Sequence, residues 1–133
     1  MENNQTPQPG RILYNEQLND DGVLKTAELI YIDTPPVEGE QWMVTWLALM
    51  EDFGEGMQVY PEPNAGGMPV TDISEANDEN INSFIECILN EAGDENPKEK
   101  LRDWVKTIET SEDYKGLQES ECKRLISLIS AKL

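Results

Sequence analysis

The chain has 133 residues, of which 27 are acidic and 10 basic, so its net charge is −17, and it contains no histidine. This length fits one domain that can bury a core without disulfides or metals. Because the chain lacks an imidazole, Ser-His-Asp and Cys-His catalytic arrangements are excluded. The two cysteines, Cys87 and Cys122, are too far apart in the chain to form a zinc motif, and their apolar neighbourhoods predict buried, reduced thiols.

The polar start of the chain predicts a flexible lead-in over residues 1–10, followed by a single domain over residues 11–133. This start has neither the positive nor the apolar region of a signal peptide. The longest apolar-rich run, Trp42–Met50, is far too short to span a membrane. We therefore expect a cytoplasmic protein that has no membrane partner.

Strand-forming sequence occupies the first half of the chain. Segments rich in β-branched, aromatic and leucine residues alternate there with turn signals. We expect about four strands, at Arg11–Tyr14, Val23–Asp33, Trp42–Met50 and Met57–Tyr60. The last two are separated by a short acidic turn, which predicts an antiparallel hairpin. Val23–Asp33 does not alternate cleanly between apolar and polar residues, and a helix is the competing interpretation there.

Two segments carry strong turn or loop signals. Asn19–Gly22 predicts a turn, because Asn and Asp bond their own backbone and Gly accepts a positive φ. Pro61–Pro69 contains three prolines and two adjacent glycines, so we expect a loop. A further short strand is a possibility at Pro69–Ile73.

The apolar period then changes to that of a helix. Three helices are expected, at Asp78–Ala92, from Pro97 to a connector at Ser111–Gly116, and at Leu117–Ala131. Asn77 or Asp78 can cap the first helix, and Gly93 ends it. Asn96 can cap the second, with Pro97 at its first position. Strands followed by helices predict an α+β fold, in which an N-terminal antiparallel sheet carries three C-terminal helices packed on one face.

Motifs that bind metals or phosphates do not occur. No glycine-rich loop is followed by Lys-Ser or Lys-Thr, and the EF-hand pattern fails at the position that requires glycine. Asp72 with Glu121 and Lys123 matches a nuclease set only in composition, because residues i and i+2 of a helix point apart. We expect no cofactor, no metal site and no enzymatic activity.

The charge is distributed unevenly along the chain. Residues 1–97 contain 20 acidic residues and only two basic ones, Arg11 and Lys25, whereas residues 98–133 are nearly balanced. Phosphate neutralisation needs cations, so direct nucleic-acid binding by residues 1–97 is not expected. Such a surface can steer a basic partner or imitate a nucleic-acid backbone, although acids that only keep the protein soluble are the alternative.

The candidate partner-binding residues flank the Trp42–Tyr60 hairpin and line the first helix. They are Glu38, Glu40, Glu51, Asp52, Phe53, Glu55 and Glu62 at the hairpin, and Asp78, Glu79 and Glu86 on the helix. We expect three of the hairpin acids, Glu51, Asp52 and Glu55, at one end of the hairpin, and the other three near the opposite end. The helix acids have no cation within their own stretch, so a basic partner would relieve their repulsion.

These features suggest two hypotheses for the function. The first is an inhibitor or immunity-type protein that blocks a basic, nucleic-acid-handling protein, such as a nuclease, a toxin or a defence effector, by electrostatic complementarity or nucleic-acid mimicry. The alternative is an adaptor or chaperone-like subunit of a larger assembly. Steep salt dependence of binding would favour the first, and salt-insensitive binding through an apolar patch would favour the second.

Overall fold

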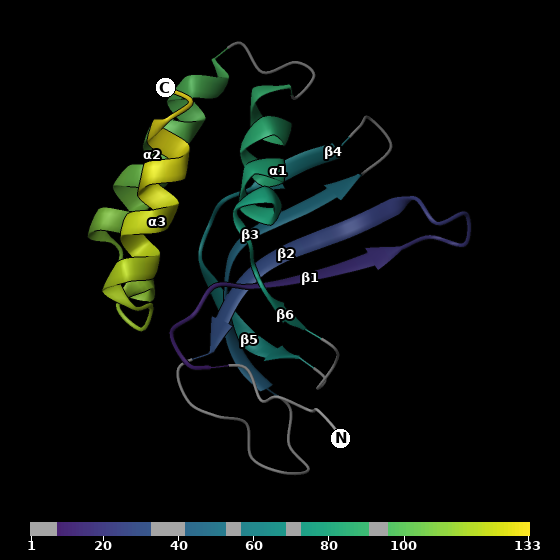
Figure 1. The fold of residues 1–133 in the computed structure, drawn as a ribbon, viewed down its shortest axis with the longest axis horizontal. Helices are drawn as coiled ribbons and strands as arrows, with labels where there is room; N and C mark the ends of the chain where they lie inside the picture. The colour runs from purple at the N-terminus through teal and green to yellow at the C-terminus, as the bar shows by residue number, and fades with distance from the viewer. Residues whose placement is uncertain (1–7, 33–41, 53–56, 69–72, 91–95) are drawn as a thin grey trace.

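The computed structural model describes residues 8–32, 42–52, 57–68, 73–90 and 96–133 (Figure 1). Its strands are β1 (Leu13–Leu18), β2 (Leu24–Ile32), β3 (Trp42–Asp52), β4 (Met57–Tyr60), β5 (Asn64–Met68) and β6 (Ser74–Glu75). Its helices are α1 (Asp78–Leu89), α2 (Pro97–Thr110) and α3 (Glu119–Ser130), with a 3₁₀ turn at Glu112–Tyr114. An antiparallel sheet followed by three helices confirms the expected α+β class, with six described strands instead of about four.

The strands form one antiparallel sheet in the order β4-β3-β2-β1-β6, and β5 pairs with the other half of β3. Strands β1 to β4 are therefore neighbours in the order of the chain. The β1–β2 turn consequently lies at the same end of the sheet as the last residues of β3 (Figure 1). The pairing of β3 with β4 confirms the expected hairpin, and β2 shows that the helical interpretation of Val23–Asp33 was wrong.

The expected loop at Pro61–Pro69 was also wrong, because β5 occupies most of it. Its composition is poor for a strand, but β3 is long enough to pair with two short strands in succession. A glycine is needed at Gly66, where a Cβ atom would lie 3.1 Å from the ring of Trp46. Gly66 thus leaves room for the Trp46 ring instead of marking a loop.

Two clusters of buried side chains lie on opposite faces of the sheet, and a β-bulge lets β3 contribute to both. The register between β2 and β3 shifts between Leu29 and Ile30, so the alternation of β3 changes face. Ala48 and Met50 join the main core between the sheet and the helices, whereas Val44 and Trp46 pack in a smaller cluster on the other face. Strict alternation would put these four residues on one face, and the bulge is the reason that they lie on two.

The helix starts follow the expected capping rules. The side chain of Asn77 accepts a hydrogen bond from the backbone N–H of Asn80 at 2.7 Å, and the side chain of Asn80 accepts one from the backbone N–H of Asn77 at 2.9 Å. Asn96 caps α2, whose first residue is Pro97. Helix α1 ends at Leu89, before the expected Ala92, and the expected terminator Gly93 lies outside the described residues.

A buried polar contact joins α2 to the 3₁₀ turn that follows it. The indole Nε1 of Trp104 in α2 donates to the hydroxyl of Tyr114 at 3.0 Å, and both side chains are buried in the main core. Burial raises the pKa of Tyr114 above its ordinary value of 10.0, and the Trp104 hydrogen bond opposes this only in part. The hydroxyl therefore stays neutral and satisfies an indole N–H that has no access to water.

Replacing Tyr114 by phenylalanine should lower the free energy of unfolding by about 1–2 kcal/mol, because the Trp104 N–H loses its partner. The raised pKa means that the folded state favours the neutral phenol. The contribution of the neutral phenol to the free energy of unfolding is complete below pH 10. It is lost as pH rises through the higher pKa of the folded state. Urea unfolding is measured at neutral and at strongly alkaline pH. The free energy of unfolding should fall less between the two for Tyr114→Phe than for the parent chain. An equal alkaline loss in both would contradict this assignment.

Candidate protein-binding surface

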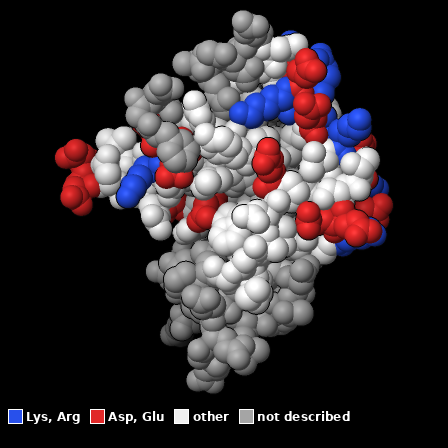
Figure 2. All heavy atoms as spheres, turned by 180° about the vertical axis from the view of Figure 1, so that it is seen from behind, with Lys and Arg blue, Asp and Glu red and all other residues white. Residues whose placement is uncertain are grey.

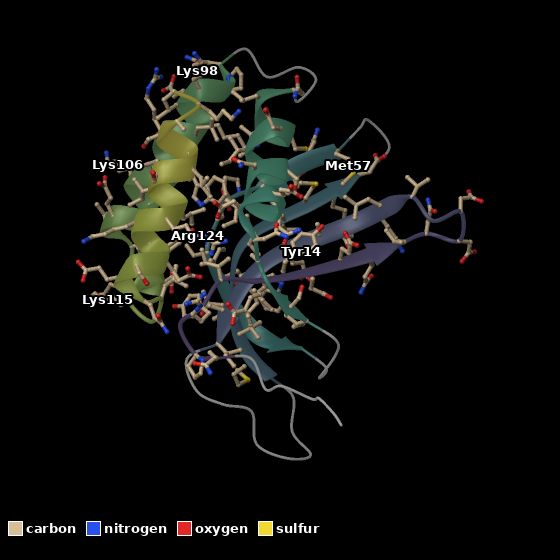
Figure 3. All side chains as sticks on the ribbon, viewed as in Figure 1. Tyr14, Met57, Lys98, Lys106, Lys115 and Arg124 are labelled. Carbon is tan, nitrogen blue, oxygen red and sulfur yellow. The ribbon has the colours of Figure 1, made fainter. Side chains whose placement is uncertain are left out.

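A network of charged groups connects α3 to Ile12, just before β1, and to Ala76 and Asp78, which follow β6. Glu121 is 4% exposed, and its Oε2 accepts the backbone N–H of Ile12 at 2.7 Å. Arg124 donates through Nη1 to Glu121 at 3.1 Å and through Nε to Asp78 at 2.8 Å. Its Nη2 donates to the backbone carbonyl of Ala76 at 2.5 Å. Figure 3 shows Arg124 between α3 and the sheet.

Burial alone would lower the pKa of Arg124, but its hydrogen bonds to Asp78 and Glu121 outweigh burial and raise that pKa. The guanidinium thus stays charged in a partly buried place. Glu121 is occupied by a backbone amide and by Arg124, so it serves the fold. Asp72, the other carboxylate of the rejected nuclease set, lies outside the described residues.

Ion pairs within the chain neutralise several acids of the first 97 residues. Arg11 pairs with Glu75 at 2.9 Å, and Lys132 of the C-terminal segment pairs with Glu86 at 3.4 Å. Together with the Arg124–Asp78 pair, these contacts supply cations that the local sequence of α1 lacks. Asp78 and Glu86 therefore have partners inside the molecule, and an external partner is not needed to explain them.

A second group of carboxylates gathers at the other end of the sheet, and we call it the acidic end. It consists of Glu16 on β1, Asp20 and Asp21 in the β1–β2 turn, and Glu51 and Asp52 at the end of β3. The register pairs Glu51 with Thr26 and Thr26 with Gln17, so Glu51 lies two strand spacings, about 10 Å, from β1. Glu16 is in register with Ala27 and Met50, so its side chain lies on the opposite face of the sheet from that of Glu51, and the acidic end includes both faces.

The turn that carries two of these acids is rigidly built. The side chain of Asn19 accepts hydrogen bonds from the backbone N–H groups of Asp21 at 2.9 Å and Val23 at 3.1 Å. Gly22 has a φ of 79°, as the turn signal predicts. Asp20 and Asp21 are exposed at this turn. Their carboxylates are therefore presented to solvent on a backbone that is already ordered.

Of the described cations, Lys25 lies on β2 beside the acidic end, and the others lie elsewhere. Among described residues, no ion pair joins Glu16, Asp20, Asp21 or Glu51 to a lysine or arginine. Figure 2 shows red side chains on the projecting hairpin with a blue side chain between them, and most of the visible blue on the opposite side. In Figure 3, Lys98, Lys106 and Lys115 lie along the helical side. The protein therefore has one end at which carboxylates outnumber cations and one end of mixed charge.

Two apolar side chains accompany the acidic end. Leu18 at the end of β1 is 54% exposed, and Val23 beside β2 is 59% exposed. They flank the turn that carries Asp20 and Asp21. Large exposed aliphatic side chains among charges are typical of a protein-binding surface, because a partner can cover them while it neutralises the charges.

The sequence-based candidates fall in separate places. Glu51 and Asp52 lie at the acidic end. Glu62 lies in the connection between β4 and β5, beside the middle of β3, because the flanking strands pair with Leu49 and Trp46. Glu62 is therefore not at the far end of the hairpin, as expected. Glu79 is exposed in the first turn of α1. The remaining candidates lie outside the described residues: Glu38, Glu40, Phe53 and Glu55.

Sequence reasoning missed Glu16, Asp20 and Asp21, although a signal for them was present. In an antiparallel meander, alternate connections lie at the same end of the sheet. The β1–β2 turn and the acids that end β3 had to meet if the first four strands pair in order. That signal required the strand order, which the residue pattern alone did not provide.

Metal ligands, thiols and membrane spans are the other features of the described residues on which the sequence makes predictions. No three His, Cys, Asp or Glu side chains among them come together to hold a metal ion. Both cysteines are half-buried free thiols, and burial raises the pKa of Cys122. Within the described segments, no helix combines the length and the apolar character needed to cross a membrane. Comparisons of the chain with known protein families, curated proteins and solved structures find no match.

Proposed function

We propose that this protein is an acidic inhibitor or immunity-type protein that binds a basic, nucleic-acid-handling protein through the acidic end. The supporting observation is the separation of charge: Glu16, Asp20, Asp21 and Glu51 form no ion pair with described residues, while the described cations other than Lys25 lie on the helical side or at Arg11. Separated charge of this kind steers a cationic partner and orients it before contact. The proposal places the protein in the cytoplasm, together with such a partner.

The partner is expected to use arginine and lysine side chains that otherwise contact phosphates. Carboxylates accept the same charge-assisted hydrogen bonds as phosphate oxygens, and arginine binds both through two parallel N–H donors. Acids held on one sheet and on an ordered turn lose less side-chain and backbone freedom on binding than the acids of a flexible tail would. Occupation of these cations would exclude nucleic acid from the partner.

The test compares two triple charge reversals. Asp20→Lys, Asp21→Lys and Glu51→Lys together alter the acidic end, and Glu109→Lys, Glu112→Lys and Glu119→Lys alter three exposed acids of the helical side by the same total charge. Each immobilised variant is used to capture proteins from nuclease-treated native lysate, which are identified by mass spectrometry. We expect the parent chain and the helical variant to retain basic nucleic-acid-handling proteins, and the acidic-end variant to lose them.

The affinity for a captured partner is then measured at increasing salt concentration. The acidic-end reversal should weaken binding by about tenfold or more at low salt, because both attraction and steering are lost. The helical reversal should have little effect. Equal effects of the two reversals would refute the proposed surface. Binding that is insensitive to salt and is lost on Leu18→Ser and Val23→Ser would instead support an adaptor that docks through an apolar patch.

A further inference from the structure

The outer edge of β1 is covered along only part of its length. Strand β6 pairs with Leu13 and Tyr14, and the backbone N–H of Ala76 donates to the carbonyl of Ile12 at 2.9 Å. This contact shows that the backbone groups of Ile12 point toward the edge. Since successive residues of a strand point their backbone groups to opposite sides, Glu16 and Leu18 also present theirs outward, while Gln17 pairs with β2.

Beyond Tyr14, the described residues supply no strand that pairs with this edge. The N–H and C=O groups of Glu16 and Leu18 thus offer two donors and two acceptors in line with the short strand β6. A register shift between Gln17 and Leu18 limits the regular edge to this short segment. An edge of this length accommodates a short extended peptide but not a long strand.

The opposite edge of the sheet is built differently. Strands β4 and β5 form it together, and Pro61 and Pro63 lie between them. Proline has no N–H to donate, so these residues interrupt any continuous ladder of hydrogen bonds there. The segment Asn15–Leu18 of β1 contains neither proline nor lysine, which are the residues that commonly block an edge. The two edges therefore differ in their capacity to accept a strand.

We propose that an extended basic segment of the partner adds to β1 as a further strand along Asn15–Leu18. This inference rests on the proposed function and specifies how the acidic end is used. Backbone hydrogen bonds to Glu16 and Leu18 give the affinity that does not depend on side chains, and the carboxylates select the charge of the segment. The exposed side chain of Leu18 covers an apolar side chain of the same segment.

The charges next to this edge determine the occupant. The carboxylate of Glu16 accepts a hydrogen bond from the hydroxyl of Tyr14 at 2.7 Å, which holds it beside the free backbone groups. Asp20 and Asp21 lie at the end of the same strand. A second copy of the chain would bring these acids against their own equivalents, and like charges on paired strands destabilise a sheet. A lysine- or arginine-bearing segment instead neutralises them.

The experiment separates backbone pairing from charge. Glu16→Pro removes the outward N–H and the carboxylate, whereas Glu16→Ala removes only the carboxylate, and neither removes a β1–β2 hydrogen-bond donor. The probe is a capped peptide of alternating lysine and threonine, and its affinity is measured for the parent chain and both variants. We expect Glu16→Pro to bind about fivefold more weakly than Glu16→Ala, the effect of one lost hydrogen bond.

A second arm leaves the protein unchanged in case Glu16→Pro perturbs the fold. The same peptide with N-methyl groups on alternate residues keeps its charge but cannot pair along one edge, so it should bind the parent chain several-fold more weakly. On adding the unmethylated peptide, the amides of Glu16 and Leu18 should become protected from hydrogen exchange. Equal binding of both peptides, no binding of either, or a concentration-dependent dimer abolished by Glu16→Pro would overturn strand addition.

The arms also distinguish this inference from the proposed function. If the Asp20→Lys, Asp21→Lys and Glu51→Lys variant loses the peptide while Glu16→Pro and Glu16→Ala bind it equally, the acidic end binds through charge alone and only strand addition fails. If the triple reversal leaves peptide binding unchanged, the proposed function fails as well. Protection of Glu16 and Leu18 together with the Glu16→Pro loss supports both.

Discussion

Replacing Glu121 by alanine is expected to lower the free energy of unfolding by about 3 kcal/mol. The change leaves the buried backbone N–H of Ile12 without an acceptor and removes the innermost partner of Arg124. Breaking a buried ion pair from one side typically costs about 3–5 kcal/mol. Arg124 is a quarter exposed and keeps Asp78 and the carbonyl of Ala76, so the low end of that range applies. Urea unfolding monitored by tryptophan fluorescence measures the effect.

Glu119→Ala is the matched control for this prediction. Glu119 lies on the same helix and pairs with Lys123 at 3.4 Å, but both side chains are largely exposed. Exposed pairs of this kind contribute about 0–1 kcal/mol. Glu121→Gln should fall between the two, because its amide oxygen can still accept the Ile12 N–H while the charge is lost. Similar effects of Glu121→Ala and Glu119→Ala would show that the buried network does not stabilise the fold.

Replacing Phe84 by alanine should lower the free energy of unfolding by about 4 kcal/mol. Phe84 is fully buried on α1, and its ring meets that of Tyr14 on β1 edge to face, with centroids 6.3 Å apart. Losing a buried aromatic ring removes apolar burial and leaves a cavity, which together cost about 3–5 kcal/mol. Because Tyr14 also orients Glu16, the variant should additionally broaden the NMR signals of Tyr14 and Glu16.

Phe84→Leu and Ser83→Ala serve as controls on the same turn of α1. Phe84→Leu keeps most of the buried volume, so the loss should be about 1–1.5 kcal/mol. Ser83 is exposed and bonds only within the helix in the described contacts, so Ser83→Ala should change stability by less than about 0.5 kcal/mol. A loss below about 1.5 kcal/mol for Phe84→Ala would mean that α1 is not anchored on β1 through this ring.

The helices were predictable from local signals, and parts of the sheet were not. The helix caps Asn77 and Asn96 are strong local signals, and their backbone hydrogen bonds form as expected. Strand β5 was not predictable, since its residues pair only because the backbone of β3 extends far enough to bind them. The bulge opposite Leu29 likewise depends on packing on both faces of the sheet. The residue pattern of β3 therefore does not reveal where its side chains change face.

The candidate surface was predictable only in part, for a related reason. Glu51 and Asp52 follow from the hairpin sequence, and both lie where the sequence placed them. Glu16, Asp20 and Asp21 join them only through the pairing order of four strands. The ion pairs of Asp78 and Glu86 connect residues 46 positions apart, so counting charges along α1 could not reveal that Arg124 of α3 and Lys132 after it neutralise them.

The contact between Glu121 and Ile12 links residues 109 positions apart, and Gln118 donates from its backbone to the carbonyl of Gly10 at 2.8 Å. The start of β1 is therefore held by a segment that is synthesised 109 residues later. While the chain is still growing, the sheet can assemble, but its first strand lacks the hydrogen bonds to Glu121 and Gln118. Truncation within α3 should consequently release the start of β1 from the helices. Nascent chains that stall before Glu121 should be unusually sensitive to proteases near Ile12.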